Sequence, residues 1–225
     1  MVLADFYDPD RIPRMYVPPS FSETDQAKLH EFIDQHSFAT LISQALDEPV
    51  ATHLPLLLNR GQGPHGTLIS HMARANWHWQ TAADQQVLAI FHGPHAYISP
   101  SWYESANVVP TWNYVAVHVY GVLRLIEDES RLSELIRQTV LRYESTQPNP
   151  WVLNSQDEAF VSKMLNAIVG FEVEINRIEG KWKLSQNHPS ERREKVVHQL
   201  RKSSDFEARQ IADLMDTSNS AAQEA

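Results

Sequence analysis

The stretch VPTWNYVAVHVYGVLRLI, residues 109–126, decides the fold of this chain. Its central part, VAVHVYGV, alternates between valine and other residues, which is typical of a strand with one buried face. Gly121 inside the run predicts a bulge or bend of the kind that a barrel needs. Pro110 marks the start of the strand or an edge of the sheet, since proline has no N–H for the ladder. The stretch therefore predicts one long, bent strand.

Shorter β-compatible runs, separated by turn residues, surround this strand. FHGPHAYISPSWY, residues 91–103, is interpreted as a barrel hairpin that turns at Gly93-Pro94. A last strand pair is expected at residues 170–185, with Glu179-Gly180 as its hairpin turn. The remaining expected strands are residues 38–43, 50–58, 67–72 and 87–93.

Helical periodicity appears at the margins of these strands. The first helix is expected after Ser22 as its N-cap and as far as about His36. Further helices are expected at residues 129–145, at 157–168 and, as a pair, within 188–216. The sequence thus predicts a mainly β fold with flanking helices (α+β), in which an antiparallel sheet closes into a small barrel.

The expected organisation is one large domain with a C-terminal addition. Residues 1–187 would form the barrel domain, in which residues 1–20 run as an extended arm. Residues 188–216 would form a helical appendage, and residues 217–225 a disordered tail.

Composition narrows the classes of function. The net charge of −9 opposes binding to nucleic acid and to anionic membranes. Cysteine is absent, which excludes disulfides, thiolate metal sites and cysteine nucleophiles. The longest apolar runs are far shorter than the ~20 residues of a membrane helix. The N-terminus also lacks the basic start and apolar core of a signal peptide. We expect a cytoplasmic protein that makes no use of a membrane.

Two motifs have a structural explanation that is favoured over a functional one. GQGPHG, residues 61–66, matches G-x-G-x-x-G, but a strand follows it where a dinucleotide site needs a helix, so it is interpreted as a hairpin loop. His92 and His95 have the spacing of a metal pair only in a helix, which Gly-Pro between them forbids. We expect these histidines to pack among aromatic rings, with haem ligation left open, and we expect no metal site.

A polar strand end in LISHMARANWHW, residues 68–79, is the most informative motif. The strand ends in Ser70, His71 and Arg74, and a hydroxyl, an amide and a guanidinium at a strand end are what a phosphate monoester needs, since arginine binds it bidentately. On composition alone, the alternative of a solvated strand end with an ordinary surface arginine is favoured. Trp112 and Asn113 form a second polar and aromatic cluster and should point to opposite faces of their strand.

A basic run near the C-terminus is the one electropositive feature of the sequence. Glu191 and Glu194 interrupt it, so a solvated helix face is favoured over a DNA-reading helix. The run consists of Arg192, Arg193, Lys195, Arg201 and Lys202, with His198 among them.

Several segments together resemble the PaiB family, whose members are described as FMN-binding negative transcriptional regulators. The resemblance covers about residues 1–190. It implies a flavin-binding split β-barrel that forms a homodimer with FMN at the subunit interface. The segments are ATHLPLLL, GTLISHMARANWHW, LAIFHGPHAYISPSWY, VPTWNYVAVHVYG and RIEGKWKLSQN.

The resemblance also implies a set of cofactor-binding residues. One strand would lie along the isoalloxazine ring, a second strand end would surround the phosphate and ribityl chain, and a third strand would close the site. Lys183 and Gln186 would approach from the partner subunit. The other residues are His53, Leu54 and Pro55 on the first strand, Ser70, His71, Met72, Ala73, Arg74 and Asn76 on the second, and Trp112 and Asn113 on the third.

No residue in the sequence is a clear general acid, base or nucleophile, so any chemistry would belong to the flavin. The leading hypothesis is an FMN-binding homodimer that acts as a negative transcriptional regulator, although the acidic charge opposes direct DNA contact. A second hypothesis is a flavin reductase or oxidase that uses a small planar substrate or a nicotinamide donor. Haem binding or degradation, motivated by the histidine-rich stretch, is the third.

Overall fold

The computed structural model describes residues 15–153 and 156–223, and the side chains as far as residue 217. Most of the predicted N-terminal arm, up to residue 14, lies outside these residues. Within them, eight strands form one antiparallel sheet with the hydrogen-bonded order β3-β2-β6-β7-β8-β5-β4, and β1 pairs with β8. The strands are β1 (Ser22–Glu23), β2 (Phe38–Ala45), β3 (Glu48–Pro55), β4 (Leu57–Asn59), β5 (Thr67–Ala73), β6 (Gln86–Ile98), β7 (Thr111–Ile126) and β8 (Ile168–Lys183).

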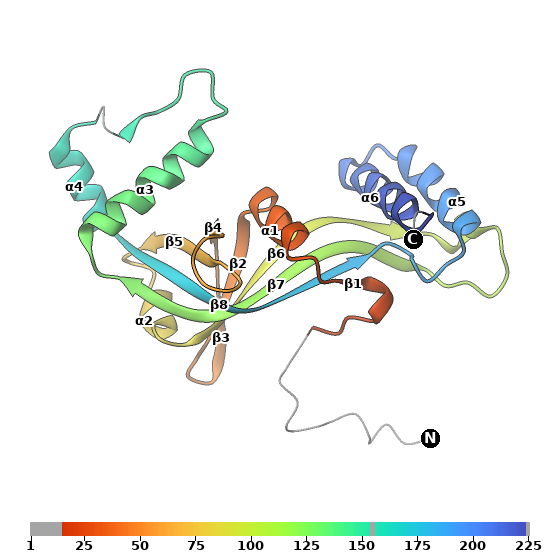
Figure 1. Ribbon diagram of the computed structural model, residues 1–225, viewed down its shortest axis with the longest axis horizontal. Coiled ribbons are helices and arrows are strands. Elements are labelled where there is room, and N and C mark those ends of the chain that lie inside the picture. The colour runs from red at the N-terminus through yellow and green to blue at the C-terminus, as the bar shows by residue number, and fades with distance from the viewer. Residues whose placement is uncertain (1–14, 154–155, 224–225) are drawn as a thin grey trace.

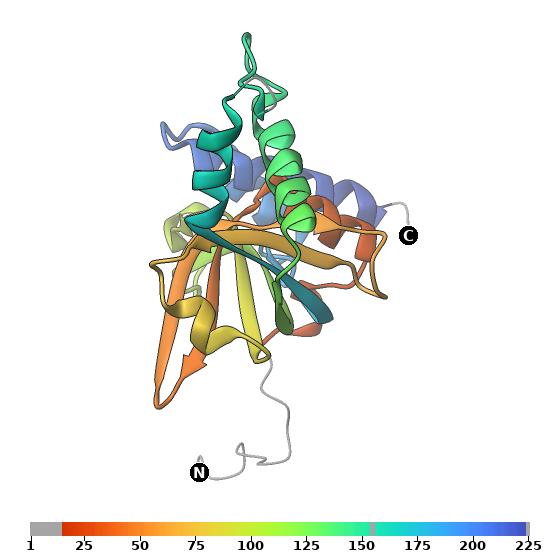
Figure 2. The same ribbon diagram turned by 90° about the vertical axis from the view of Figure 1, so that its left-hand side faces the viewer.

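The sheet curls so that its two ends approach each other without pairing. β3 and β4 end the hydrogen-bonded path, yet they follow each other in the chain through Leu56. The Ser70 hydroxyl of β5 donates a hydrogen bond to the Pro55 carbonyl of β3 at 2.5 Å. Figure 2 shows the short strands curling around the end of the long ones. The predicted mainly β, antiparallel split-barrel architecture is confirmed, but the expected closure of the sheet is wrong, because β3 and β4 end the hydrogen-bonded path without pairing.

Helices lie at the margins of the sheet, as expected. α5 and α6 pack at one end of the three long strands, and α3 and α4 project beside the other end (Figure 1). The helices are α1 (Gln26–Gln35), α2 (His78–Ala82), α3 (Glu129–Glu144), α4 (Glu158–Asn166), α5 (Ser190–Arg201) and α6 (Phe206–Gln223), with 3-10 turns η2 (Pro19–Phe21) and η3 (Pro100–Tyr103).

Two helix boundaries differ from the prediction. α1 is capped by Asp25, whose carboxylate accepts hydrogen bonds from the N–H groups of Ala27 and Lys28, and not by Ser22, which lies in β1. α6 continues past residue 216 to Gln223. The proposed division of the chain at residue 187 stays a prediction. Side chains of α5 and α6 do share one hydrophobic cluster with the sheet and α1, among them Leu200, Ile211 and Met215.

Two predicted hairpins are wrong, because the strands run straight through the expected turns. β6 is continuous, and Gly93-Pro94 forms an irregularity between His92 and His95 where the register with β7 shifts. The aromatic ring of Phe32 fills the space beside Gly93, which holds α1 against the strand there. β8 is likewise continuous, and Glu179 pairs with His118 of β7 where a turn was expected.

Three other predictions concern single positions along the strands. Gly121 lies at a register shift between β7 and β8, so the predicted bulge is confirmed. GQGPHG connects β4 to β5 as the predicted hairpin loop. The expected strand 50–58 is divided at Leu56, because β3 pairs with β2 and β4 pairs with β5.

The two faces of the sheet differ in burial. One face carries the core, including Phe91, Val117 and Val119, which are fully buried. We call the opposite side of the long strands and of β2–β3 the outer face, because directly paired residues project to the same side. Its side chains are mostly half-exposed. The outer face consists of Thr40, Ile42, His53, Leu88, Ile90, Trp112, Tyr114, His118, Tyr120, Arg177, Glu179, Lys181 and Lys183.

Candidate functional site

The predicted residues of β3 and β5 lie together where the sheet curls. Ser70 bonds to Pro55, and the Asn76 amide donates to the Thr52 hydroxyl at 3.1 Å. His53 lies on the outer face, where its Nδ1 is 3.0 Å from the Thr40 hydroxyl. The strand ends thus form one polar group, which we call the β3–β5 group. Its other predicted members differ in exposure: Leu54 and Met72 are buried, His71 is half-exposed and Ala73 is exposed.

A buried imidazole under this group was missed by sequence reasoning. His78, at the start of α2, is fully buried. Its Nε2 is 2.8 Å from the Ser43 hydroxyl and its Nδ1 is 2.8 Å from the Thr52 hydroxyl. Its backbone N–H also donates to the Asn76 side chain. The histidine therefore ties α2 to β2 and β3, and the residues flanking it in NWHW gave no sign of partners so distant in sequence.

Arg74 is committed to the backbone. Its Nε donates to the Asn166 carbonyl and its Nη2 donates to the Ile168 carbonyl, both at 2.8 Å. These carbonyls lie where α4 ends and β8 begins. The guanidinium side chain is exposed and keeps Nη1 for another contact. Its main role in this structure is to hold the α4–β8 junction.

The second set of predicted residues lies at the far end of β7 and β8. Trp112 and Asn113 point to opposite faces, as predicted: Trp112 is 51% exposed, whereas Asn113 is fully buried. Asn113 accepts a hydrogen bond from the Ser185 hydroxyl beneath α6. Gln186 closes the turn after β8, because its side chain bonds to the backbone of Leu184 and Trp182. Asn113 and Gln186 therefore have structural partners.

Two lysines on the outer face give this end a positive character. The Lys183 ammonium donates to the Thr111 hydroxyl at 2.6 Å. The Lys181 ammonium donates to the Tyr16 carbonyl at 2.8 Å and lies 5.3 Å from the ring centroid of Tyr114. Burial, and then the charge of Lys181, lower the pKa of Lys183. An anion placed here would favour the charged form of Lys183.

The two sets lie too far apart in one chain to share a small ligand. Arg74 donates a hydrogen bond to Ile168, the first residue of β8, whereas Lys183 is the last residue of that strand. β8 has 16 residues. An extended strand of that length measures about 50 Å.

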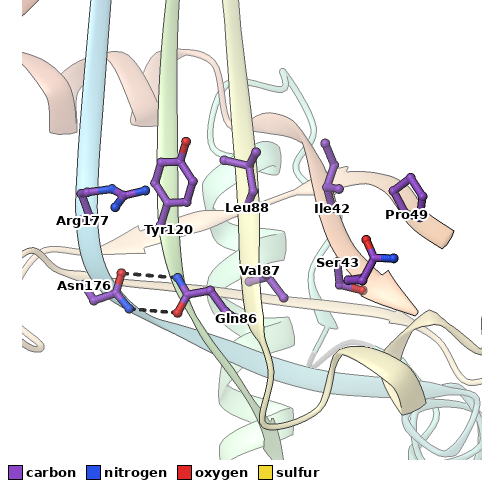
Figure 3. Close-up of a pocket in the computed structure, with 10 residues that line it drawn as sticks. Ile42, Ser43, Pro49, Gln86, Val87, Leu88, Tyr120, Asn176 and Arg177 are labelled. Carbon is purple, nitrogen blue, oxygen red and sulfur yellow. Dashed lines mark hydrogen bonds between the residues drawn. The ribbon is translucent and has the colours of Figure 1, made fainter. Parts of the chain in front are cut away.

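A groove of about 640 Å³ hollows the outer face between β2 and β8. Figure 3 shows Ile42, Leu88, Tyr120 and Arg177 in a row that crosses four neighbouring strands, β2, β6, β7 and β8. The Arg177 guanidinium lies 3.9 Å from the centroid of the Tyr120 ring. The Gln86 and Asn176 side chains bond to each other at the polar wall. An apolar floor with an amide and guanidinium wall suits a planar ring that has a polar edge.

His95, in the stretch FHGPHAYISPSWY, has structural partners. No group of three or more metal-ligating side chains was found among the described residues. His95 Nδ1 lies 2.7 Å from a Glu207 carboxylate oxygen, and its ring is 5.8 Å from that of Trp112. His95 therefore packs against a ring, as predicted, and bridges β6 to α6.

The basic run is mostly paired within the chain. Arg192 donates to the Ser105 hydroxyl, Arg193 is buried, and Lys195 lies between Glu104 and Glu191. Arg201 pairs with Asp216. These pairings agree with a structural helix face.

Stability should fall in mild acid, because burial lowers the pKa of His71, His78, His118 and His188 below 6.5. The unfolded chain then binds more protons than the folded chain as the pH falls below about 6.5. The contribution of these groups is complete above that pH and is lost below it. Urea unfolding at pH 7.5, 6.5 and 5.5 should give a decreasing free energy of unfolding. An unchanged or higher value at pH 5.5 would contradict the burial of these imidazoles.

No helix among the described residues is long and apolar enough to cross a membrane.

The known proteins similar to this chain agree with its fold. Three solved structures share the fold at low sequence identity. The flavocytochrome Anf3 from Azotobacter vinelandii has a TM-score of 0.55 at 17% identity, over 72% of this chain and 69% of that one. The FAD and heme binding protein from Mycobacterium smegmatis has a TM-score of 0.52 at 15% identity, over 72% and 73%. The conserved hypothetical protein Rv2991 from Mycobacterium tuberculosis has a TM-score of 0.55 at 14% identity, over 78% and 94%.

Relatives that are similar in sequence identify the family of the chain. The family model described as "Putative FMN-binding domain" matches residues 15–177. "Protease synthase and sporulation protein PAI 2" of Bacillus subtilis is 37% identical over 203 residues, which are 90% of this chain and 97% of that protein. An uncharacterised protein of Emericella nidulans, AN0679, is 27% identical over 81% of this chain and 89% of its own length. The chain therefore belongs to the PaiB family of FMN-binding-domain proteins.

Proposed function

We propose that the protein binds FMN between two copies of the chain, which pair through their outer faces. The observation that carries the proposal is the separation of the two predicted residue sets along β7 and β8. A two-fold axis that runs the long strands in opposite directions would bring the β3–β5 group of one copy beside Trp112 and Lys183 of the other. Membership of the FMN-binding family supports the choice of ligand.

The outer face has the character of such an interface. Leu88, Ile90, Tyr114 and Tyr120 are half-exposed side by side on the long strands, and apolar side chains gathered on one face often mark an interface. The groove of about 640 Å³ opens on the same face. Pairing of two copies would bury both and exclude water from the ligand.

The residues present fit the groups that FMN carries. The exposed His53 and the backbone of Leu54 and Pro55 would face the polar edge of the ring, and Trp112 of the partner copy would cover it. The ammonium of Lys183 and the remaining Nη1 of Arg74 would bind the phosphate through charge-assisted hydrogen bonds. Ser70, His71, Met72, Ala73 and Asn76 would shape the strand end around the chain of the ligand. Asn113 and Gln186 would act by positioning β7 and the end of β8.

Bound FMN would supply electron or hydride transfer, and this chain would supply orientation and a dry site.

The role of a negative transcriptional regulator belongs to the same proposal, without direct contact to DNA. The net charge of −9 and the internal pairing of the basic run support an indirect role. A gel-shift series over salt with the upstream region of its own gene should show no complex. A complex that forms at low salt would contradict the indirect role.

A subunit-mixing experiment tests the shared site. His53→Glu places a charge in the β3–β5 group, and Lys183→Glu reverses a charge at the other end of the sheet. Each variant alone should bind FMN at least about tenfold more weakly, because His53→Glu places a carboxylate against the polar edge of the ring and Lys183→Glu places one beside the phosphate dianion. Equimolar mixing with exchange of subunits should restore normal affinity to about a quarter of the sites, one in each mixed dimer. FMN fluorescence titration measures both.

Lys28→Glu, an equal charge change on the exposed surface of α1, is the matched control and should leave FMN affinity unchanged. Sedimentation of the unmodified protein should give a dimer. A monomer, or a mixture that recovers no sites, would refute the shared site. Loss of FMN binding in the Lys28 control would show that the effect is one of overall charge.

A further inference from the structure

A second pocket, of about 470 Å³, lies at the end of the outer face where β6 and β7 meet the turn between α5 and α6. We call it the ring pocket. It belongs to the α5–α6 end of the molecule (Figure 1), away from the groove beside β3. Its lining residues are His95, Ala96, Tyr97, Trp102, Trp112, Gln199, Leu200, Lys202, Ser203, Asp205 and Ala208.

Aromatic rings form the wall of the ring pocket. Trp112 and Tyr97 meet at an interplanar angle of 70°, with centroids 5.9 Å apart, so they form a corner. Trp102 of η3 adds a third ring to the lining. Tyr97 is 46% exposed and Trp112 is 51% exposed, so ring surface stays available in the cavity. Aromatic faces arranged around a cavity attract a cation through their quadrupoles.

Charge at the rim favours a cation as well. Asp205 lines the pocket, and its carboxylate accepts a hydrogen bond from the Glu207 N–H at 3.0 Å. Glu207 holds His95 at 2.7 Å, which adds a second carboxylate beside the rings. Two cations oppose these carboxylates: the exposed side chain of Lys202 lines the pocket from the C-terminus of α5, and the Arg209 guanidinium donates to the carbonyl of the lining residue Ser203 at 2.8 Å. The net charge of −9 also raises the local concentration of cations.

The geometry points to the ring pocket as a binding site for an organic ammonium ion of about the size of choline. The methyl groups of a quaternary ammonium fill an aromatic corner without needing hydrogen bonds, and the carboxylates at the rim balance its charge. An anion would meet the ring faces and the carboxylate of Asp205, with the ammonium of Lys202 as the opposite charge in the lining. The proposal does not depend on FMN, although Trp112 is shared, so a bound cation would lie beside the proposed flavin site.

Calorimetric titration of the full-length, flavin-free protein with choline tests the proposal. Choline should bind about tenfold more tightly than its neutral isostere 3,3-dimethyl-1-butanol, since the two differ in charge and hardly in shape. Tyr97→Leu should weaken choline binding several-fold. Phe160→Leu, which removes an equally exposed ring from α4, is the matched control and should have no effect.

Two charge variants give opposite expectations. Asp205→Asn keeps the capping function of the side chain but removes its charge, so it should weaken choline binding about threefold. Lys202→Gln should strengthen it by a similar factor. FMN titration of both variants should be unchanged, which separates this proposal from the flavin site. Equal affinity for choline and its neutral isostere, or no effect of Tyr97→Leu, would overturn the inference.

Discussion

Gly121→Ala should lower the free energy of unfolding by about 3 kcal/mol, because the strands at this position leave no space for a methyl group. A Cβ atom there would lie 2.3 Å from the Glu174 carbonyl oxygen and 2.7 Å from a Val173 methyl group. The oxygen belongs to the backbone of the paired strand and cannot move without opening the ladder between β7 and β8. Urea unfolding monitored by tryptophan fluorescence measures the difference.

Gly61→Ala is the matched control for this substitution. Its added Cβ would meet only the Asn59 side chain, at an ordinary contact distance of 3.6 Å. The control should unfold at nearly the same urea concentration as the unmodified protein. If the Gly121 variant did so too, the tight approach of β7 to β8 would be wrong.

His78→Leu should destabilise the protein by about 3 kcal/mol, because it leaves the buried Ser43 hydroxyl without its partner and leaves the half-buried Thr52 hydroxyl with only Asn76. Ser43 and Thr52 each lie 2.8 Å from a ring nitrogen of His78, and the ring is fully buried. Leucine fills part of the space but neither donates nor accepts a hydrogen bond. Equilibrium urea unfolding at pH 7.5 gives the value.

A second variant separates lost hydrogen bonds from lost packing. Ser43→Ala added to His78→Leu removes the hydroxyl that has lost its hydrogen-bond partner. The double variant should therefore be more stable than the sum of the two single changes predicts. Strict additivity would mean that the hydroxyl finds another partner. The His78 variant should also show a smaller loss of stability between pH 7.5 and 5.5, because one buried imidazole is gone.

The sequence predicted the long strand β7 and the bulge at Gly121 because both depend on local pattern. Alternation along residues 117–123 matches the buried and half-exposed sides of the strand. Gly121 was recognised because glycine inside a strand marks a close approach of another backbone. The opposite orientation of Trp112 and Asn113 followed from the same alternation.

The errors occurred at glycines that look like turns. Gly93-Pro94 and Glu179-Gly180 have strong local turn character, yet β6 and β8 continue through both. In each case α1 packs where a side chain would otherwise stand: Phe32 against Gly93 and Leu29 against Gly180. The glycines are needed for helix packing, and sequence pattern alone does not distinguish this use from a turn.

The predicted site residues also divide into what local sequence could identify and what depended on tertiary contacts. The motif resemblance named residues in both sets, but it could not place Arg74 and Lys183 at opposite ends of β8. It also missed His78, whose partners come from strands 26 and 35 residues away. Whether the named residues bind FMN stays a prediction that the mixing experiment will test.

The sequence by itself determined the strand pattern, the acidic surface and the family, because these follow from local alternation, from composition and from motifs. Only the tertiary structure decided which turn-like glycines keep a strand extended, where the guanidinium of Arg74 is used, and how far apart the two residue sets lie. The physical reason is that ladder pairing and helix packing join residues distant in sequence. Together these contacts outweigh the local preference of a Gly-Pro or Glu-Gly pair for a turn.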